Sequence, residues 1–158
     1  MMVAMAKRSA GLLMYRLSEG EVEVFLVHPG GPFFAKKDAG SWGIPKGEYN
    51  EDEEPLVAAR REFTEETGFV ADGEFVELGS VRQKSGKVVM AWAMEGDCDP
   101  ADLVSNTCTI EWPPRSGRSM EIPEIDQGRW FGIANARAWI RKEQEPLLDS
   151  LDALVAGL

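Results

Sequence analysis

Cysteine and histidine are both scarce in this 158-residue chain, which contains two cysteines and one histidine. Because Cys98 and Cys108 are too few for a disulfide scaffold or a zinc site, we expect two ordinary thiols and no disulfide. Basic residues are also outnumbered, since 17 Lys and Arg stand against 27 Asp and Glu, a net charge of −10. This charge argues against nucleic acid or an anionic membrane as the main partner, because both attract basic surfaces.

Long apolar runs are absent from the sequence, and none approaches the ~20 residues that a membrane-spanning helix needs. The opening residues, MMVAMAKR, lack the apolar core and cleavage site of a secretory signal, so we expect a cytoplasmic protein. The remaining composition, 44% hydrophobic and 28% charged residues, is typical of a soluble globular protein. We find no repeat, low-complexity tract or linker, and therefore expect one domain over residues 1–158.

Apolar periodicity predicts strands interleaved with one central helix. The expected strands are 9–17, 21–28, 75–81, 88–94, 108–112 and 129–132, and the expected loops include 29–43 and 113–123. The central helix is expected from Pro55 to Thr67, because proline is tolerated in a first turn and Gly68 can cap the end. Two amphipathic helices are expected at 135–142 and 146–155. This order predicts an α/β fold in which helices cover a mixed central sheet.

The central helix carries three glutamates, Glu62, Glu65 and Glu66, at spacings i, i+3 and i+4. This spacing places all three carboxylates on one face of the helix. Like charges at such spacings repel and destabilise a helix, and a divalent cation that prefers carboxylate oxygens would remove the repulsion. A helix face of this kind can instead be merely solvated, so the wider sequence context has to decide between the two interpretations.

That context is the segment GEYNEDEEPLVAARREFTEETGF, residues 47–69, which resembles the Nudix box at every fixed position. The box reads G-x5-E-x7-R-E-U-x-E-E-x-G-U, where U is apolar, and the matching residues are Gly47, Glu53, Arg61, Glu62, Phe63, Glu65, Glu66, Gly68 and Phe69. The resemblance implies a Nudix-type α/β/α sandwich with a mixed central sheet. It also implies hydrolysis of a nucleoside diphosphate linked to another group, with Mg²⁺ as the usual cofactor and Mn²⁺ as a substitute.

The resemblance further assigns roles within the box. The metal ligands would be the carboxylates of Glu62, Glu65 and Glu66 and the backbone carbonyl of Gly47, where no side chain blocks the approach. Arg61 would pair with Glu53 and brace the loop against the helix, so that these two residues join the catalytic set without binding metal.

Outside the box, Glu124 lies six residues before Trp130, the offset at which mutator-type members of the family place an additional metal-binding glutamate. Glu121 is the competing candidate for this role. The general base differs among members of the family, and Glu62, Glu65 and Glu124 all remain candidates.

Several other residues are candidates for substrate binding. Lys46 and Trp42 belong to a W-x-x-P-K-G sequence that is similar to Nudix enzymes acting on dinucleoside polyphosphates, diphosphoinositol polyphosphates or capped messenger RNA. Lys46 is expected to bind phosphate, and Trp42 either to stack on a base or to pack internally. Arg115 and Arg118 are candidates for contacts with the distal phosphates. We expect His28 to be structural.

These observations predict metal-dependent hydrolysis of a nucleoside polyphosphate or dinucleoside polyphosphate, by attack of water on phosphorus. The alternatives are a catalytically silent, nucleotide-binding regulatory Nudix domain and an isomerase built on the same fold. The expected partner is a small nucleotide substrate, without a membrane or nucleic acid. The substrate, the number of metals and the oligomeric state stay open, because residues outside the box determine the leaving group.

Overall fold

The computed structural model describes residues 7–157 and contains a six-stranded mixed sheet. The opening residues 1–6, on which the expectation of no secretory signal partly rests, lie outside this range. The strand order is β4(Phe75–Arg82), β5(Val88–Glu95), β1(Arg8–Ser18), β2(Glu21–Pro29) and β8(Ile125–Gly132), with the short β3(Lys46–Glu48) also paired to β1. β1 runs parallel to β5 and antiparallel to β2 and β3, so the predicted mixed sheet is confirmed.

Strand β1 is apolar along most of its length because both faces of the sheet are covered. Leu12 and Met14 face a cluster that includes Phe63 of the helix α1(Pro55–Thr67). The alternate residues, Leu13 and Tyr15, face a second cluster on the other side of the sheet. Alternating side chains of one strand therefore supply both cores, as expected for a central strand.

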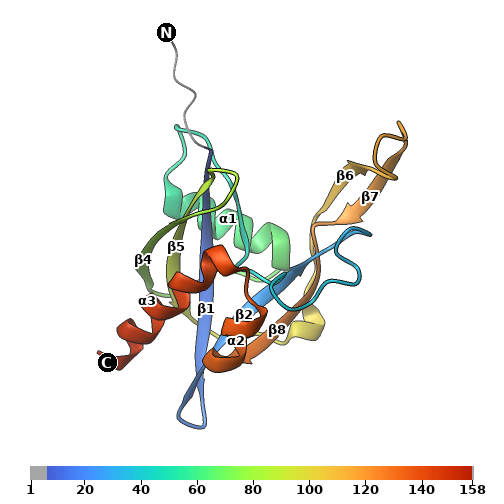
Figure 1. Ribbon diagram of the computed structural model, residues 1–158. Helices are drawn as coiled ribbons and strands as arrows, with labels where there is room; N and C mark the ends of the chain where they lie inside the picture. Colours follow the sequence, from blue (N-terminus) through green and yellow to red (C-terminus); the bar gives the residue numbers. More distant parts are fainter. Residues whose placement is uncertain (1–6, 158) are drawn as a thin grey trace.

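The second cluster is covered by α2(Ile133–Trp139) and α3(Glu145–Ala156), which are joined by the 3₁₀ turn η2(Lys142–Gln144). In Figure 1 these red helices cross in front of the sheet, and α1 lies farther back. Two helical layers around one sheet give the predicted α/β/α sandwich. No helix within residues 7–157 combines the length and the apolar character that crossing a membrane would require.

Helix α1 has the predicted bounds. Pro55 occupies the first turn, and Gly68 ends the helix with a left-handed φ of 79° while its N–H donates to the Thr64 carbonyl at 2.8 Å. The helix buries Ala59 and Phe63 against the sheet. This packing holds the glutamate-bearing face of α1 at the edge of the first cluster.

A hairpin formed by β6(Thr107–Glu111) and β7(Ser119–Pro123) projects away from the rest of the molecule (Figure 1). The sequence predicts a loop over residues 113–123, and this prediction is wrong for residues 119–123. These residues form β7, which pairs with β6 over five residue pairs. The 3₁₀ turn η1(Pro100–Asp102) and strand β3 are likewise not anticipated by the pattern, and β8 begins four residues before the predicted strand. Short or solvent-exposed strands such as β3 and β7 show little hydrophobic periodicity.

Both cysteines are free thiols, as expected from the sequence. Burial, and secondarily the charge of Asp97, raises the pKa of the Cys98 thiol to about 12. At pH 8 only ~10⁻⁴ of the thiol would be ionised, so we expect iodoacetamide to alkylate Cys98 about 10³-fold more slowly than an ordinary thiol. Peptide mass spectrometry of timed samples, with a urea-unfolded control, measures the rate. If Cys98 were alkylated as fast in the folded protein as in the urea-unfolded control, its burial would be contradicted.

Candidate active site

The glutamates of α1 differ in burial, although they share one face. Glu62 and Glu66 are only 9% and 7% exposed, whereas Glu65 is exposed to solvent. The Glu66 carboxylate accepts a hydrogen bond from the backbone N–H of Lys46 at 3.0 Å. The Glu62 carboxyl group lies against Gly47, so closely that a Cβ at residue 47 would overlap it. The β3 backbone thus contacts both buried carboxylates.

Arg61 links the loop before α1 to the helix itself. Its Nε and Nη2 each donate to one carboxylate oxygen of Glu53 at 2.9 Å, which makes the two-pronged ion pair that the box implies. Its remaining nitrogen, Nη1, donates to Glu62 at 2.7 Å and lies 3.4 Å from the Glu65 carboxylate. Arg61 therefore also neutralises two of the three helix glutamates, a contact that the sequence does not predict.

Glu124 is brought to this cluster by a chain of backbone hydrogen bonds. Its N–H donates to the Asn106 carbonyl at 3.0 Å, and the Asn106 N–H donates to the Glu65 carbonyl at 2.8 Å. Carbonyls in the last turn of a helix have no partner within the helix, so α1 offers free acceptors to residues 104–106. On the other side, the Gly30 N–H donates to the Glu124 carbonyl at 2.9 Å. Glu121, the competing candidate, is exposed on β7.

The four carboxyl groups influence one another electrostatically. Burial, together with the charges of Glu124 and Glu62, raises the pKa of Glu66 to about 8, although the hydrogen bond from the Lys46 N–H and the charge of Lys46 oppose the shift. Burial also raises the pKa of Glu124, which lies within hydrogen-bonding reach of Glu66, and the charge of Glu65 adds to the increase. The pKa of Glu62 is raised by burial as well, against the effect of Arg61. This is a site with an excess of negative charge.

The donor set fits a hard divalent cation, because all the groups that could coordinate it are oxygens of carboxylates or of the Gly47 backbone. Within residues 7–157, however, no three His, Cys, Asp or Glu side chains are gathered as a formed metal centre. Arg61 contributes to this separation of the carboxylates, because it pairs with Glu62 and approaches Glu65. A cation bound here would compete with Arg61 for these two carboxylates.

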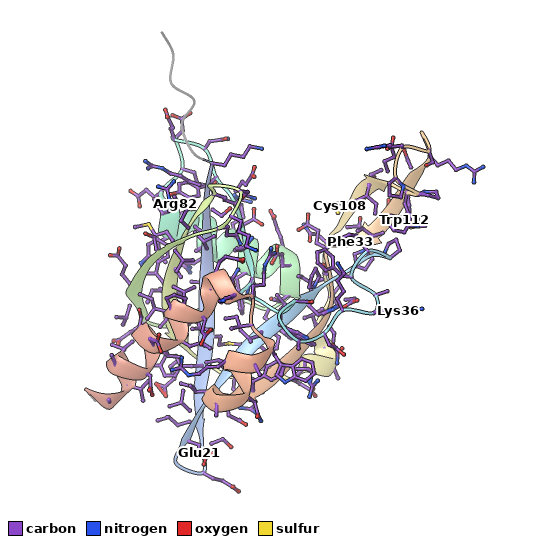
Figure 2. All side chains as sticks on the ribbon, in the orientation of Figure 1. Glu21, Phe33, Lys36, Arg82, Cys108 and Trp112 are labelled. Carbon is purple, nitrogen blue, oxygen red and sulfur yellow. The ribbon has the colours of Figure 1, made fainter. Side chains whose placement is uncertain are left out.

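A cavity of about 270 Å³ opens beside Glu66 and Glu124. Its polar lining also includes Lys46, Arg141 and Gln144, and its apolar lining includes Val27, Pro29, Phe34, Ile44, Ile122 and Ile125. The lining comes from the loop after β2, from β3, from the base of the hairpin and from the turn before α3. In Figure 2, the label Cys108 shows where the hairpin lies, and the labels Phe33 and Lys36 show where the loop after β2 lies. The cavity thus places charged groups beside an apolar surface.

Three candidate substrate-binding residues, Trp42, Arg115 and Arg118, do not line this cavity. Trp42 is 1% exposed and packs against His28 and Phe131, so it belongs to the core and cannot stack on a base. Arg115 and Arg118 lie in the exposed loop at the end of the hairpin and do not line the cavity. The hairpin directs this loop away from α1 (Figure 1).

Lys46, in contrast, does line the cavity, and its phosphate-binding role stays a prediction. Burial is the main cause that lowers the pKa of its amine, followed by the charge of Lys87. His28 is buried, as expected for a structural residue, and its ring contacts the Asp126 carboxylate and the Lys37 carbonyl. It therefore fixes the loop after β2, which forms one wall of the cavity.

Sequence reasoning missed three cavity residues, Phe34, Arg141 and Gln144. Phe34 and Arg141 are partly exposed, and nothing in their local spacing differs from ordinary surface residues. Gln144 is fully buried, which is unusual for glutamine, but the sequence alone does not reveal this burial.

Comparison with known proteins adds a family and a fold. A family model described as "NUDIX domain" matches residues 5–151, and no curated protein matches the sequence significantly. Among solved structures, the Ap4A hydrolase of C. elegans is similar with a TM-score of 0.67 and 22% identity, covering 95% of this chain and 99% of that one.

Two further structures share the fold at lower identity. The NUDIX domain of Shewanella oneidensis NrtR, complexed with ADP ribose, has a TM-score of 0.65 and 15% identity, with 97% and 90% of the two chains covered. The C-terminal domain of mouse MUTYH, in a complex with human PCNA, has a TM-score of 0.61 and 16% identity, with 98% and 92% covered. Since a hydrolase, an ADP-ribose complex and a protein–protein complex share this fold, function has to be argued from the site.

Proposed function

Because this chain belongs to the Nudix family, whose box it carries complete, we propose that it is a magnesium-dependent pyrophosphohydrolase acting on a nucleoside polyphosphate or dinucleoside polyphosphate. The observation that carries the proposal is the arrangement of buried Glu66 and partly buried Glu124 beside Lys46 at one cavity. When one carboxylate is buried and a second lies beside it, a proton or a cation at the site relieves their repulsion. The apolar part of the same lining suits a nucleoside.

In this proposal Glu62, Glu65, Glu66 and Glu124, with the Gly47 carbonyl, hold the metal. When bound, Mg²⁺ would neutralise phosphate charge and lower the pKa of a coordinated water. Lys46 binds and orients a phosphate group through its positive charge. Among the three candidates for the general base, Glu124 is the one that lines the cavity, and we therefore favour it as the acceptor of the proton from the attacking water.

A substrate screen tests the proposal. The protein is incubated with nucleoside triphosphates, dinucleoside polyphosphates, nucleotide sugars and ADP-ribose, with Mg²⁺ or with EDTA, and products are identified by mass spectrometry. We expect Mg²⁺-dependent cleavage of a phosphoanhydride bond in the triphosphates or dinucleoside polyphosphates. Tight nucleotide binding without any product would contradict catalysis and support a ligand-binding Nudix domain instead.

The bracing role of Arg61 gives a separate prediction. Glu53→Gln removes the charge that holds the Arg61 fork, so Arg61 is less well positioned beside Glu62. We expect kcat to fall by about tenfold, the lower end of what the loss of a ligand-orienting partner costs. Glu54→Gln is the matched control, because Glu54 is adjacent, exposed and makes no side-chain cap to α1. Equal kcat values for the two variants would show that the fork does not position the site.

A further inference from the structure

Gln144 has a buried donor without a partner. Its side chain is fully buried, and its Oε1 accepts a hydrogen bond from the Ile44 N–H at 2.9 Å. This bond fixes the orientation of the amide, because only the oxygen end can accept it. The other end, Nε2, is buried and makes no hydrogen bond within the described chain. Since Gln144 lines the cavity, an acceptor oxygen on a bound ligand would satisfy Nε2.

Arg141 adds a charged donor three residues earlier. Its backbone N–H donates to the Trp42 carbonyl at 2.7 Å, and its carbonyl accepts from the Gln144 N–H at 2.9 Å. These bonds fix the turn against the segment that leads into β3. Arg141 lines the cavity, and the one carboxylate partner of its guanidinium within residues 7–157 is Glu143, at a long 3.8 Å. Most of its five donors are therefore available to a ligand.

We propose that Arg141 and Gln144, together with Lys46, form an anion subsite that binds a phosphate group of the substrate. All three residues line one cavity, and two of them carry positive charge in a protein of net charge −10. A phosphate offers several acceptor oxygens and suits a guanidinium fork and an amide N–H together. The identification of the anion as a substrate phosphate rests on the proposed function, whereas anion binding itself can be measured separately.

Calorimetric titration with inorganic tripolyphosphate in excess Mg²⁺, at fixed ionic strength, tests the subsite. Arg141→Ala should raise Kd by about tenfold or more, because a charge-assisted, two-pronged contact is lost. Lys142→Ala is the matched control, since it removes one positive charge from the same turn but Lys142 is exposed and does not line the cavity. Its Kd should stay within about twofold of wild type, as expected for an exposed charge that is screened by solvent and salt. Equal effects of the two variants, or no binding to wild type, would overturn the proposal.

The substitution Gln144→Glu tests the role of the Nε2 donor. Gln144→Glu keeps an oxygen for the Ile44 N–H and replaces Nε2 by a second oxygen, which repels phosphate. We expect Kd at pH 8 to rise by at least about tenfold, with thermal melting as the check that the variant is folded. If a folded Gln144→Glu variant binds tripolyphosphate as wild type does, Gln144 is not part of the subsite. Arg141→Lys, which keeps the charge but not the fork, should bind with an intermediate Kd.

Steady-state kinetics separates this inference from the proposed function. With the substrate that the wild-type protein cleaves, Arg141→Ala should raise KM by about tenfold and change kcat by less than about threefold, because binding of the anion is affected more than the chemical step. An unchanged KM would overturn the subsite while the hydrolase proposal stands. If the wild-type protein cleaves none of the substrates, the proposed function fails, and the titrations still decide whether the anion subsite exists.

Discussion

Glu66→Gln is expected to remove most of the hydrolytic activity and, in the absence of metal, to make the folded protein more stable. Loss of one carboxylate from the proposed metal site should lower kcat by about 10³-fold, which corresponds to about 4 kcal/mol of transition-state stabilisation. The amide keeps an oxygen for the Lys46 N–H, so the fold should persist. Activity and stability should therefore change in opposite directions.

The stability gain depends on pH in a defined way. The pKa of Glu66 is raised from 4.5 to about 8 on folding, so the folded state binds a proton more tightly than the unfolded state between these values. Stability due to this group is greatest below pH 4.5 and is lost as the pH rises towards 8. Glutamine carries no charge to bury. We therefore expect Glu66→Gln to raise Tm in EDTA at pH 8 by roughly 5–10 °C and to change it little at pH 4.5.

Thermal melts of both proteins in EDTA at the two pH values, together with kcat in saturating Mg²⁺, measure these effects. Glu121→Gln is the control, because Glu121 is an exposed carboxylate on β7 outside the cluster. It should leave both Tm and kcat near wild-type values. A Glu66→Gln variant with nearly wild-type kcat would show that this carboxylate does not hold a catalytic metal.

The part of this site that could be predicted from the sequence is the part that is local in the chain. The helix from Pro55 to Thr67 follows from a proline, an apolar stripe and a terminal glycine, all within 14 residues. The common face of Glu62 and Glu66 follows from helix geometry alone. Because the Nudix box fixes many positions in one short segment, it also identifies the family and the sandwich fold.

The rest of the site depends on contacts between distant residues, which periodicity cannot report. Glu124 is linked to α1 through backbone hydrogen bonds of Asn106. Both residues lie in short segments that show no hydrophobic periodicity. Trp42 could stack or pack on sequence grounds, and only the surrounding helices and strands decide for packing. Arg115 and Arg118 are remote because β7 extends the hairpin, and an exposed strand has too few apolar residues to be recognised. The metal-binding roles themselves stay predictions.

Gly47→Ala is expected to have an effect nearly as large as Glu66→Gln, although it adds only one methyl group. The methyl would overlap the Glu62 carboxyl group, which must then move from its place between Gly47 and Arg61. Displacement of one proposed metal ligand should lower kcat by about 10²-fold or more, since small misplacements of catalytic groups are costly. The overlap should also lower the free energy of unfolding by about 1–3 kcal/mol. Steady-state kinetics and urea unfolding measure the two effects.

Two comparisons distinguish a clash with Glu62 from a general loss of glycine. Gly132→Ala is the control, because a Cβ at residue 132 would meet nothing within 4 Å and φ is −62° there. It should leave kcat unchanged. Adding Glu62→Asp to Gly47→Ala shortens the displaced side chain and should restore stability without restoring kcat. This combination would show coupling between residues in contact. If Gly47→Ala keeps wild-type kcat, the Glu62 carboxylate can leave Gly47 without consequence, and its close fit against β3 has no catalytic role.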